Sequence, residues 1–407
     1  MHLAAAYVLA DTAYAGTADL SNRIEARGRD TAGVLGVDLV DVPSARIDIR
    51  NRRWEYLFDY TANALLPDLE LGVSPQLLQS ADLGVAWRSR RVRIGITEYA
   101  SYGEQNSTYL LGGGPTAAVP APTVTPVGGG TQLLAPPVTL LSGSSRTVLA
   151  SQFGLSRRWS GTASIEYDIL GGLDAPSRIY LPLVKGPRAD ATASYSLTEI
   201  DTLQTRASAL VSTATSAPCS PVAIDVRAGS NCDPSAQDGI VTETWQHRLS
   251  RTWTSALGAG ASYVRLRLRD PQPYEQFVFP VGSASVERAT GPVESRNVMH
   301  LEALVTPVLD VRTGLFDERG QASFDVSQRF RQTTVLGQVA AARSIESPLM
   351  QPATFFTASL EIDEELSKMV SLGGGIRYAW QEQGNLGTFS GGYVFGFVTV
   401  RAPEIRF

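Results

Sequence analysis

Histidines and paired carboxylates are the residues of this chain that could support catalysis. Two of the three histidines, His247 and His300, lie well inside the sequence, and Glu302 follows His300 at the next alternate position. A hydrolase could use such a histidine–carboxylate pair, yet no serine in a matching motif accompanies it. The cysteines and histidines do not cluster at the spacing of metal ligands. We therefore predict no enzyme activity, no catalytic residue, no metal site and no cofactor.

The glycine triplets 112–114 and 128–130 are also not phosphate-binding loops, because Pro/Ala/Thr-rich sequence and no helix follows each of them. The net charge of −5 argues against a nucleic-acid partner. The 407 residues are 43% hydrophobic and 18% charged, which excludes a fully disordered chain. No stretch is long and apolar enough to cross a bilayer as a helix.

The N-terminus has the features of an export signal. An apolar run over residues 3–10 precedes Ala13, Tyr14, Ala15 and Gly16, which fit the A-x-A site of signal peptidase. We therefore interpret residues 1–15 as a signal-peptide remnant and residues 16–407 as the exported domain. The alternative is that this segment is an ordinary first strand.

Alternation of apolar and polar residues dominates the rest of the chain. Residues 161–169 and 370–380, for example, place apolar side chains on one parity and polar ones on the other. A soluble antiparallel sheet or an outer-membrane barrel could produce this pattern. The barrel is favoured because the apolar parity is rich in Ala, Gly and aromatic residues. Ionised pairs such as Glu166 with Asp168 and Arg319 with Asp325 also lie deep within the strands.

The connections alternate between short turns and long loops, as in outer-membrane barrels. Short turns recur around residues such as Arg52, Arg90 and Arg157, and the longer loops are 103–144, 171–186, 214–238, 269–273, 344–352 and 382–390. Trp54, Trp87, Trp159, Trp253 and Trp245 lie at or near short turns, as an aromatic girdle would require. We predict an all-β fold, a single transmembrane antiparallel up-and-down β-barrel in the bacterial outer membrane, surrounded by outer-membrane lipid.

We expect 18 strands, with 16 as the alternative. The predicted ranges are 31–41, 45–51, 54–65, 78–88, 91–102, 145–155, 160–170, 187–197, 202–213, 239–249, 253–264, 276–287, 297–309, 316–328, 333–343, 353–363, 369–381 and 391–401. Pro280 makes one of these strands a weak assignment, because proline cannot donate to the ladder. The loops 103–144 and 214–238 are expected to be extracellular.

Charged residues fall almost wholly on one parity, which should line the lumen. The expected pore-lining residues are Arg46, Asp48, Arg50, Glu55, Asp59, Arg88, Arg93, Glu166, Asp168, Arg188, Asp190, Arg206, Arg248, His300, Glu302, Asp317, Arg319, Asp325, Glu361 and Arg377. Their signs nearly balance, so neighbouring strands can pair them. Glu98, Glu243 and Glu318 have the lipid-facing parity, and we expect them near strand ends.

The sequence shows two resemblances to known families. Phe407, with Tyr393, Phe395 and Phe397 at the same parity, resembles the C-terminal assembly signal of outer-membrane barrels, which implies contact with the barrel-assembly machinery. The hairpins at 181–188 and 306–310 resemble those of the 18-stranded barrels associated with exopolysaccharide export. This second resemblance implies periplasmic polysaccharide-export components as further partners.

An 18-stranded barrel is wide enough for an aqueous channel. The expected function is passage of polysaccharide or hydrophilic solutes across the outer membrane, as in an exopolysaccharide secretion porin. The alternative is a structural or adhesive barrel that binds partners through its outer loops without transport. Because the 103–144 loop is long and almost uncharged, we expect part of it to fold over or into the mouth.

Cys219 and Cys232 should form a disulfide. Both lie in the 214–238 loop, outside the cytoplasm, where oxidation is the default. Closing a loop of about 14 residues stabilises the fold by roughly 3 kcal/mol in the chain-entropy model. Thiol-specific labelling of the unreduced, denatured protein should find no free cysteine, whereas labelling of both would refute the pairing.

Overall fold

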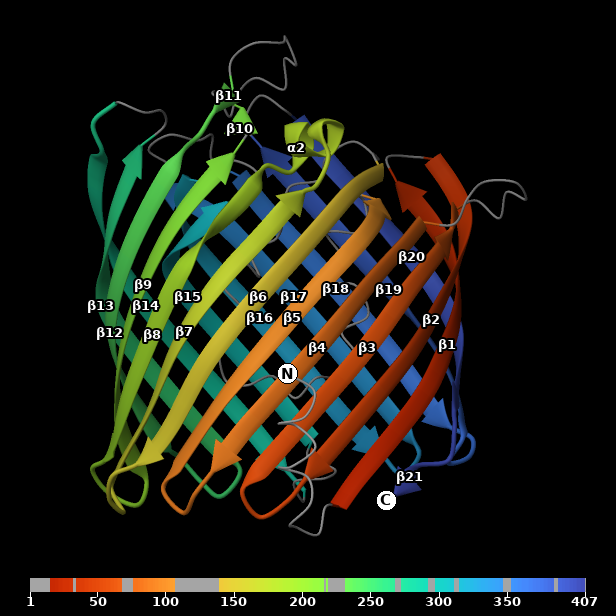
Figure 1. Cartoon of the computed structure of the whole chain (residues 1–407), viewed down its shortest axis with the longest axis horizontal. Coiled ribbons are helices and arrows are strands. Elements are labelled where there is room, and N and C mark those ends of the chain that lie inside the picture. The colour runs from red at the N-terminus through yellow and green to blue at the C-terminus, as the bar shows by residue number, and fades with distance from the viewer. Residues whose placement is uncertain are drawn as a thin grey trace, which may run out of the picture.

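Long strands with alternating side chains close on themselves into a barrel (Figure 1). The structure is a computed structural model, and it describes residues 15–31, 34–67, 76–106, 139–215, 217–218, 231–267, 272–291, 297–310, 315–346, 353–383 and 387–406. Neighbouring strands pair antiparallel around the whole circumference. The seam is closed by the first and last long strands, from Ser21 opposite Arg401 to Thr31 opposite Gly391.

Eighteen strands make the wall. The first nine are β1 (Ala15–Thr31), β2 (Val34–Arg50), β3 (Trp54–Leu66), β4 (Gln76–Arg88), β5 (Val92–Asn106), β6 (Thr139–Gly154), β7 (Trp159–Gly172), β8 (Leu183–Ser196) and β9 (Asp201–Thr215). The others are β12 (Ser235–Arg248), β13 (Trp253–Arg267), β14 (Glu275–Thr290), β15 (Asn297–Asp310), β16 (Leu315–Phe330), β17 (Thr333–Glu346), β18 (Ala353–Glu365), β19 (Val370–Gln383) and β20 (Gly387–Arg401).

Four short elements accompany the wall strands in the described part of the chain. The helix α2 (Ala175–Tyr180) lies between β7 and β8. Strands β10 (Ala217–Pro218) and β11 (Asn231–Cys232) form a small separate hairpin between β9 and β12. Strand β21 (Ile405–Arg406) continues the pairing with β1. No helix among the residues that the structure describes is long and apolar enough to cross a membrane.

The predicted fold class and strand number are confirmed, but the first two predicted strands are wrong. The ranges 31–41 and 45–51 belong to one strand, β2, and the strand β1 was not predicted. Pro43 favours a turn in the sequence because it lacks an N–H group. In the barrel it interrupts the pairing of β2 with β3 between Asp41 and Ser44, while it stays opposite Asn22 of β1.

Short turns gather at one end of the barrel and longer connections at the other (Figure 1). β1 begins opposite Arg50, and the Arg401 N–H at the end of β20 donates to the carbonyl of Met369, so both terminal strands reach the short-turn end. The long loops are shorter than predicted, because β5 extends to Asn106, β6 begins at Thr139 and β12 begins at Ser235.

Several predictions fall on residues outside the described ranges. These are the signal peptide, most of the 103–144 loop, Cys219 and Phe407. Cys232 itself lies in β11, opposite Ala217. The signal peptide and the disulfide therefore stay predictions.

One face of the strands is apolar and exposed, as a lipid-facing surface requires. Leu83, Ile96, Leu149 and Ile165 on neighbouring strands each expose half or more of their surface. Trp54 and Trp87 are register partners on the same face as these residues, beside the short turns. Such a placement is that of an interfacial aromatic girdle.

The expected position of one lipid-facing carboxylate is wrong. Glu98 lies near the middle of β5 rather than near its end. Glu243 lies closer to the short turn that follows β12, and Glu318 lies at an irregularity in the pairing of β16 with β17.

Candidate functional site

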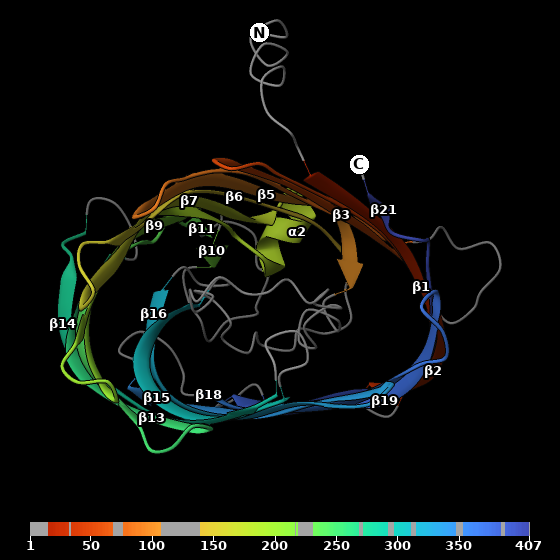
Figure 2. The ribbon, with the colours of Figure 1, turned by 90° about the horizontal axis from the view of Figure 1, so that it is seen from below.

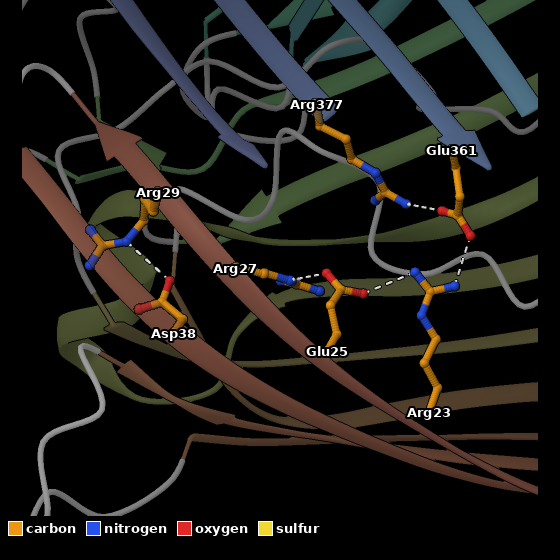
Figure 3. Close-up of polar contacts among 7 residues, drawn as sticks. All are labelled: Arg23, Glu25, Arg27, Arg29, Asp38, Glu361 and Arg377. Atoms are coloured by element: carbon orange, nitrogen blue, oxygen red, sulfur yellow. Dashed lines mark hydrogen bonds and ion pairs between the residues drawn. The ribbon is translucent and has the colours of Figure 1, made fainter. Parts of the chain in front are cut away.

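The opposite face of the same strands carries the charged residues and points into the barrel. Register pairs connect these residues from strand to strand: Arg46 lies opposite Asp59 on β2 and β3, and Glu166 lies opposite Arg188 on β7 and β8. Because register partners share a face, every expected pore-lining residue falls on this inner parity. Figure 3 shows part of the set on the inner side of the wall.

The densest charge network lies at the seam, on β1, β2, β18 and β19 (Figure 3). Arg23 bridges two carboxylates, with Nη2 at 3.0 Å from Glu25 and Nη1 at 2.8 Å from Glu361. Arg27 pairs with the other Glu25 oxygen at 2.5 Å, and Arg377 approaches Glu361 at 3.5 Å. Glu25 and Arg27 are buried, so these charges are satisfied mainly by one another.

Aromatic rings of β20 support the same network. The Arg23 guanidinium carbon lies 3.5 Å from the ring centre of Phe397, and that of Arg27 lies 5.0 Å from the ring centre of Tyr393. Phe395 and Phe397 are both buried. Cation–π contacts strengthen when they are desolvated. The aromatic series that we expect to act in barrel assembly therefore lies on the inner face beneath arginines, and its role in assembly stays a prediction.

Ion pairs continue around the inner wall from β2 to β9. They are Arg50 with Asp48 at 2.6 Å, Arg46 with Asp59 at 3.6 Å, Arg88 and Arg93 with Glu55 at 3.1 and 2.8 Å, Arg146 with Asp168 at 2.8 Å, Arg188 with Glu166 and Asp190 at 3.6 and 2.5 Å, and Arg206 with Asp190 at 2.9 Å. Arginine suits this arrangement because its planar fork can bind two carboxylates at once.

The inner face from β12 to β15 has a different composition. Thr242, Thr244 and Gln246 on β12 are followed by Ser283 and Ser285 on β14, so hydroxyl and amide groups line this side. This side of the lumen also contains three more of the expected pore-lining residues, which are Arg248, His300 and Glu302.

Arg248 is exposed at the short-turn end of β12. His300 lies opposite Asp325 and has its Nε2 3.8 Å from Glu302. The structure therefore brings His300 and Glu302 together, and no group of three or more potential metal ligands occurs among the described residues.

At the loop end, the hairpin of β15 and β16 leaves the wall and enters the lumen. β15 pairs with β14 only up to Val305, opposite Gly282, although both strands continue beyond this point. Figure 2 gives a view along the barrel, and in it the beginning of β16, at the loop end, lies inside the ring of strands. Pro280 lies on the part of β14 that has no β15 partner, where a residue without an N–H is tolerated.

The tip of this hairpin packs on the inner wall of distant strands. Leu309 and Phe316 are register partners, so they project from one face of the hairpin. Phe316 is buried in an apolar cluster with Val264 and Phe279, and Leu309 packs against Val184 of β8. Burying these side chains holds the hairpin across the inner face from β14 to β8.

Buried charges fix the base of the hairpin. Arg319 Nε donates to Asp317 at 2.7 Å, and Ser344 Oγ of β17 donates to the same carboxylate at 2.7 Å. Asp317 and Arg319 are almost fully buried, and the register shifts between Glu318 and Arg319. These expected pore-lining residues therefore lie where the hairpin bends away from the wall, in a closed polar cluster.

The helix α2 approaches the inner wall at the same end. A Cβ on Gly172 would lie 2.6 Å from the backbone of Ser177, so only glycine allows this contact. Ser177 Oγ also accepts from the Leu141 N–H of β6 at 2.9 Å. Asp174 caps the helix, and its hydrogen bonds with Ser177 hold its pKa below the usual range. The cap is therefore complete above the ordinary pKa of Asp and is lost only as pH falls through this lowered value.

Sequence reasoning missed the charges contributed by β1. Arg23, Glu25, Arg27 and Arg29 alternate with Ile24, Ala26 and Gly28, which is the same pattern that identified the other strands. Arg29 pairs with Asp38 of β2 at 3.1 Å. The alternation could have revealed this strand, but the proximity of the signal-peptide site and the turn assigned at Pro43 obscured it.

Replacing Arg23 should destabilise the barrel far more than replacing an exposed lumen arginine. Arg23→Met leaves Glu25 and Glu361 with one partner fewer in a buried setting, a loss of roughly 3 kcal/mol in the free energy of unfolding. Arg50→Met is the matched control, because Arg50 is 61% exposed and its pair with Asp48 is worth about 0–1 kcal/mol. Urea unfolding in lipid vesicles, followed by tryptophan fluorescence, measures both. If both variants lost the same free energy of unfolding, the seam network would add no more stability than an exposed ion pair.

Solved structures of outer-membrane proteins are similar to this chain at very low sequence identity. The FrpB iron transporter from Neisseria meningitidis, as apoprotein, has a TM-score of 0.50 at 10% identity, over 90% of this chain and 62% of its own. This chain thus spans less than two thirds of the FrpB length. OccK2 (OpdF) from Pseudomonas aeruginosa has a TM-score of 0.46 at 9% identity, over 95% and 98% of the two chains.

Sequence comparison gives the family. No curated protein matches the chain. The sequence model of the EpsX exopolysaccharide export family matches residues 8–276, about two thirds of the chain, which include β1 to β13. The closed barrel with its apolar exterior and charged interior agrees with an outer-membrane channel. The chain belongs to the EpsX exopolysaccharide export family.

Proposed function

We propose that this chain carries an uncharged or mixed-charge exopolysaccharide through its own lumen. The observation that carries the proposal is the pairing of the lumen charges. Arginines on the inner wall lie within ion-pair distance of carboxylates on the same strand or on strands up to three places away, from Arg23 with Glu25 and Glu361 to Arg206 with Asp190. A channel for a strongly anionic polymer would instead present an excess of cations.

Paired charges suit a polyhydroxyl chain. The fields of an adjacent guanidinium and carboxylate largely cancel beyond a Debye length, about 8 Å at physiological salt. Their remaining donors and acceptors stay available for sugar hydroxyls. The hydroxyl and amide side chains on β12 and β14 offer the same kind of contact without charge. A sugar polymer could therefore slide along both sides through exchangeable hydrogen bonds.

The inward hairpin of β15 and β16 is proposed as the constriction of this passage. It projects over the inner faces of β8 to β14 at the loop end, and Leu309 and Phe316 anchor it there. The helix α2 lies against β6 and β7 at the same end. The expectation that part of the 103–144 loop folds over or into the mouth stays a prediction, because most of this loop lies outside the described residues.

The direction of export indicates which partners should meet each end of the barrel. Polymer would enter at the short-turn end, which faces the periplasm in a barrel of this kind. Periplasmic polysaccharide-export components are proposed to meet the barrel there. The barrel-assembly machinery is proposed to insert the chain.

Polymer block in planar bilayers should reveal the charge preference. We expect ion conductance with the wild-type barrel, and we expect neutral dextran to block it at lower concentration than dextran sulfate of similar size. Stronger block by dextran sulfate would contradict the preference for uncharged polymer. Absence of any conductance in correctly inserted protein would contradict transport and favour the adhesive alternative.

Removing the hairpin tip should widen the passage. A variant in which residues 309–316 are replaced by a two-residue turn should conduct at least twofold more than wild type, because the segment across the inner wall is gone. A second variant lacking residues 112–138 tests the loop. If only the loop deletion raises conductance, the loop is the constriction and the assignment to the hairpin is wrong. Insertion of both variants is verified by their resistance to extraction with salt.

A further inference from the structure

A polar patch lies on the lipid-facing surface, on the opposite side of the wall from the lumen. Glu98 of β5 has the outward parity, and both of its oxygens accept hydrogen bonds from β6. Ser145 Oγ donates to one oxygen at 2.8 Å, and Thr147 Oγ1 donates to the other. Thr147 is the register partner of Glu98, so all three side chains project from the outer face.

The patch lies at the depth of the hydrocarbon core. Trp87 marks the short-turn interface and lies opposite Ile94 of β5. Tyr102, an exposed aromatic residue on the same face of β5, marks the other interface. Glu98 lies midway between Ile94 and Tyr102. Its neighbours on this face, including Leu83, Ile96 and Leu149, are exposed and apolar.

An ionisable group in this position is costly against lipid, and such groups normally face protein or water. The two hydroxyls satisfy only part of the capacity of a carboxylate to accept hydrogen bonds. Small residues lie on one side of the group, since Ala81 and Ala100 form the next outward pair on β4 and β5 towards the loop end. This region of the outer face is therefore polar, and another protein surface can approach it closely.

We propose that this patch is the interface between two copies of the chain in the outer membrane. The donors and the acceptor lie side by side at nearly the same depth, so the patch is complementary to itself. A two-fold axis along the membrane normal would place Glu98 of one copy against Thr147 and Ser145 of the other. An isologous contact of this kind removes both carboxylates from lipid and pairs them reciprocally.

Glu243 provides a matched control on the same outer face. It accepts from Thr205 Oγ1 at 2.7 Å, and it lies near Trp245 at the short-turn interface, where headgroups and water can solvate it. A Glu243→Leu substitution therefore removes an outward carboxylate without altering the proposed interface.

The test measures how many copies of the chain associate with one another in a membrane. The full chain is reconstituted in phospholipid vesicles, and its copies are counted by native mass spectrometry and by disulfide cross-linking through Leu83→Cys. We expect a dimer for wild type, for Glu243→Leu and for Glu98→Gln, whose amide can still bond hydroxyls. Glu98→Leu should lower the dimer fraction at least tenfold while the barrel stays folded, as judged by heat-modifiable migration on gels.

Three outcomes would overturn the proposal. One is a wild-type chain that is monomeric in vesicles. Another is a Glu98→Leu variant that dimerises as wild type does. The third is recovery of the chain from its native membrane with a different protein cross-linked at Leu83→Cys.

Discussion

Inside the hydrocarbon of a membrane, a backbone N–H or C=O without a partner is too costly to leave unpaired, and the rest of this structure follows from that constraint. The pairing of β1 with β20 satisfies the last free edge. Two departures from regular strand pairing each have a local explanation. Pro43 still has β1 on its other side, and the unpaired stretch of β14 begins only where the β15–β16 hairpin turns inward.

Once the sheet is closed, alternation determines the chemistry of the two surfaces. Side chains of one parity meet lipid, and those of the other share an enclosed interior where charges must find one another. The buried contacts of Arg23 and Arg27 show how far this pairing goes, because carboxylates and aromatic rings both surround the guanidinium groups. Many of the interior charges on the described residues therefore lie in ion pairs. That property links the wall architecture to the kind of polymer proposed to pass through it.

Much of this could be predicted from the sequence because period-two alternation is local. Neighbouring positions in the sequence were enough to predict the strands from β3 onward and the short turns. They were also enough to predict the inner parity of residues such as Glu166 and Arg188. Strand β1 was missed because two local signals, the A-x-A site and Pro43, competed with its alternation. The inward hairpin was beyond sequence reasoning, since the contacts of Leu309 with Val184 and of Phe316 with Val264 join strands far apart in the chain. The depth of Glu98 was also misjudged, because β5 extends further into the loop than its sequence pattern indicates.

The seam joins the two ends of the sequence, and this fixes when its charge network can form. Arg23 and Glu361 are separated by 338 positions, and the ring that lies over Arg23 belongs to Phe397. The contacts of Arg23 with Glu361 and Phe397 can form only after β18 and β20 have joined the barrel, whereas Arg23 and Arg27 can pair with Glu25 as soon as β1 forms. The complete network therefore depends on closure of the barrel. A chain that lacks β20 lacks the ring of Phe397 over Arg23 and keeps an open edge on β1, and an open strand edge is a site for pairing with another chain.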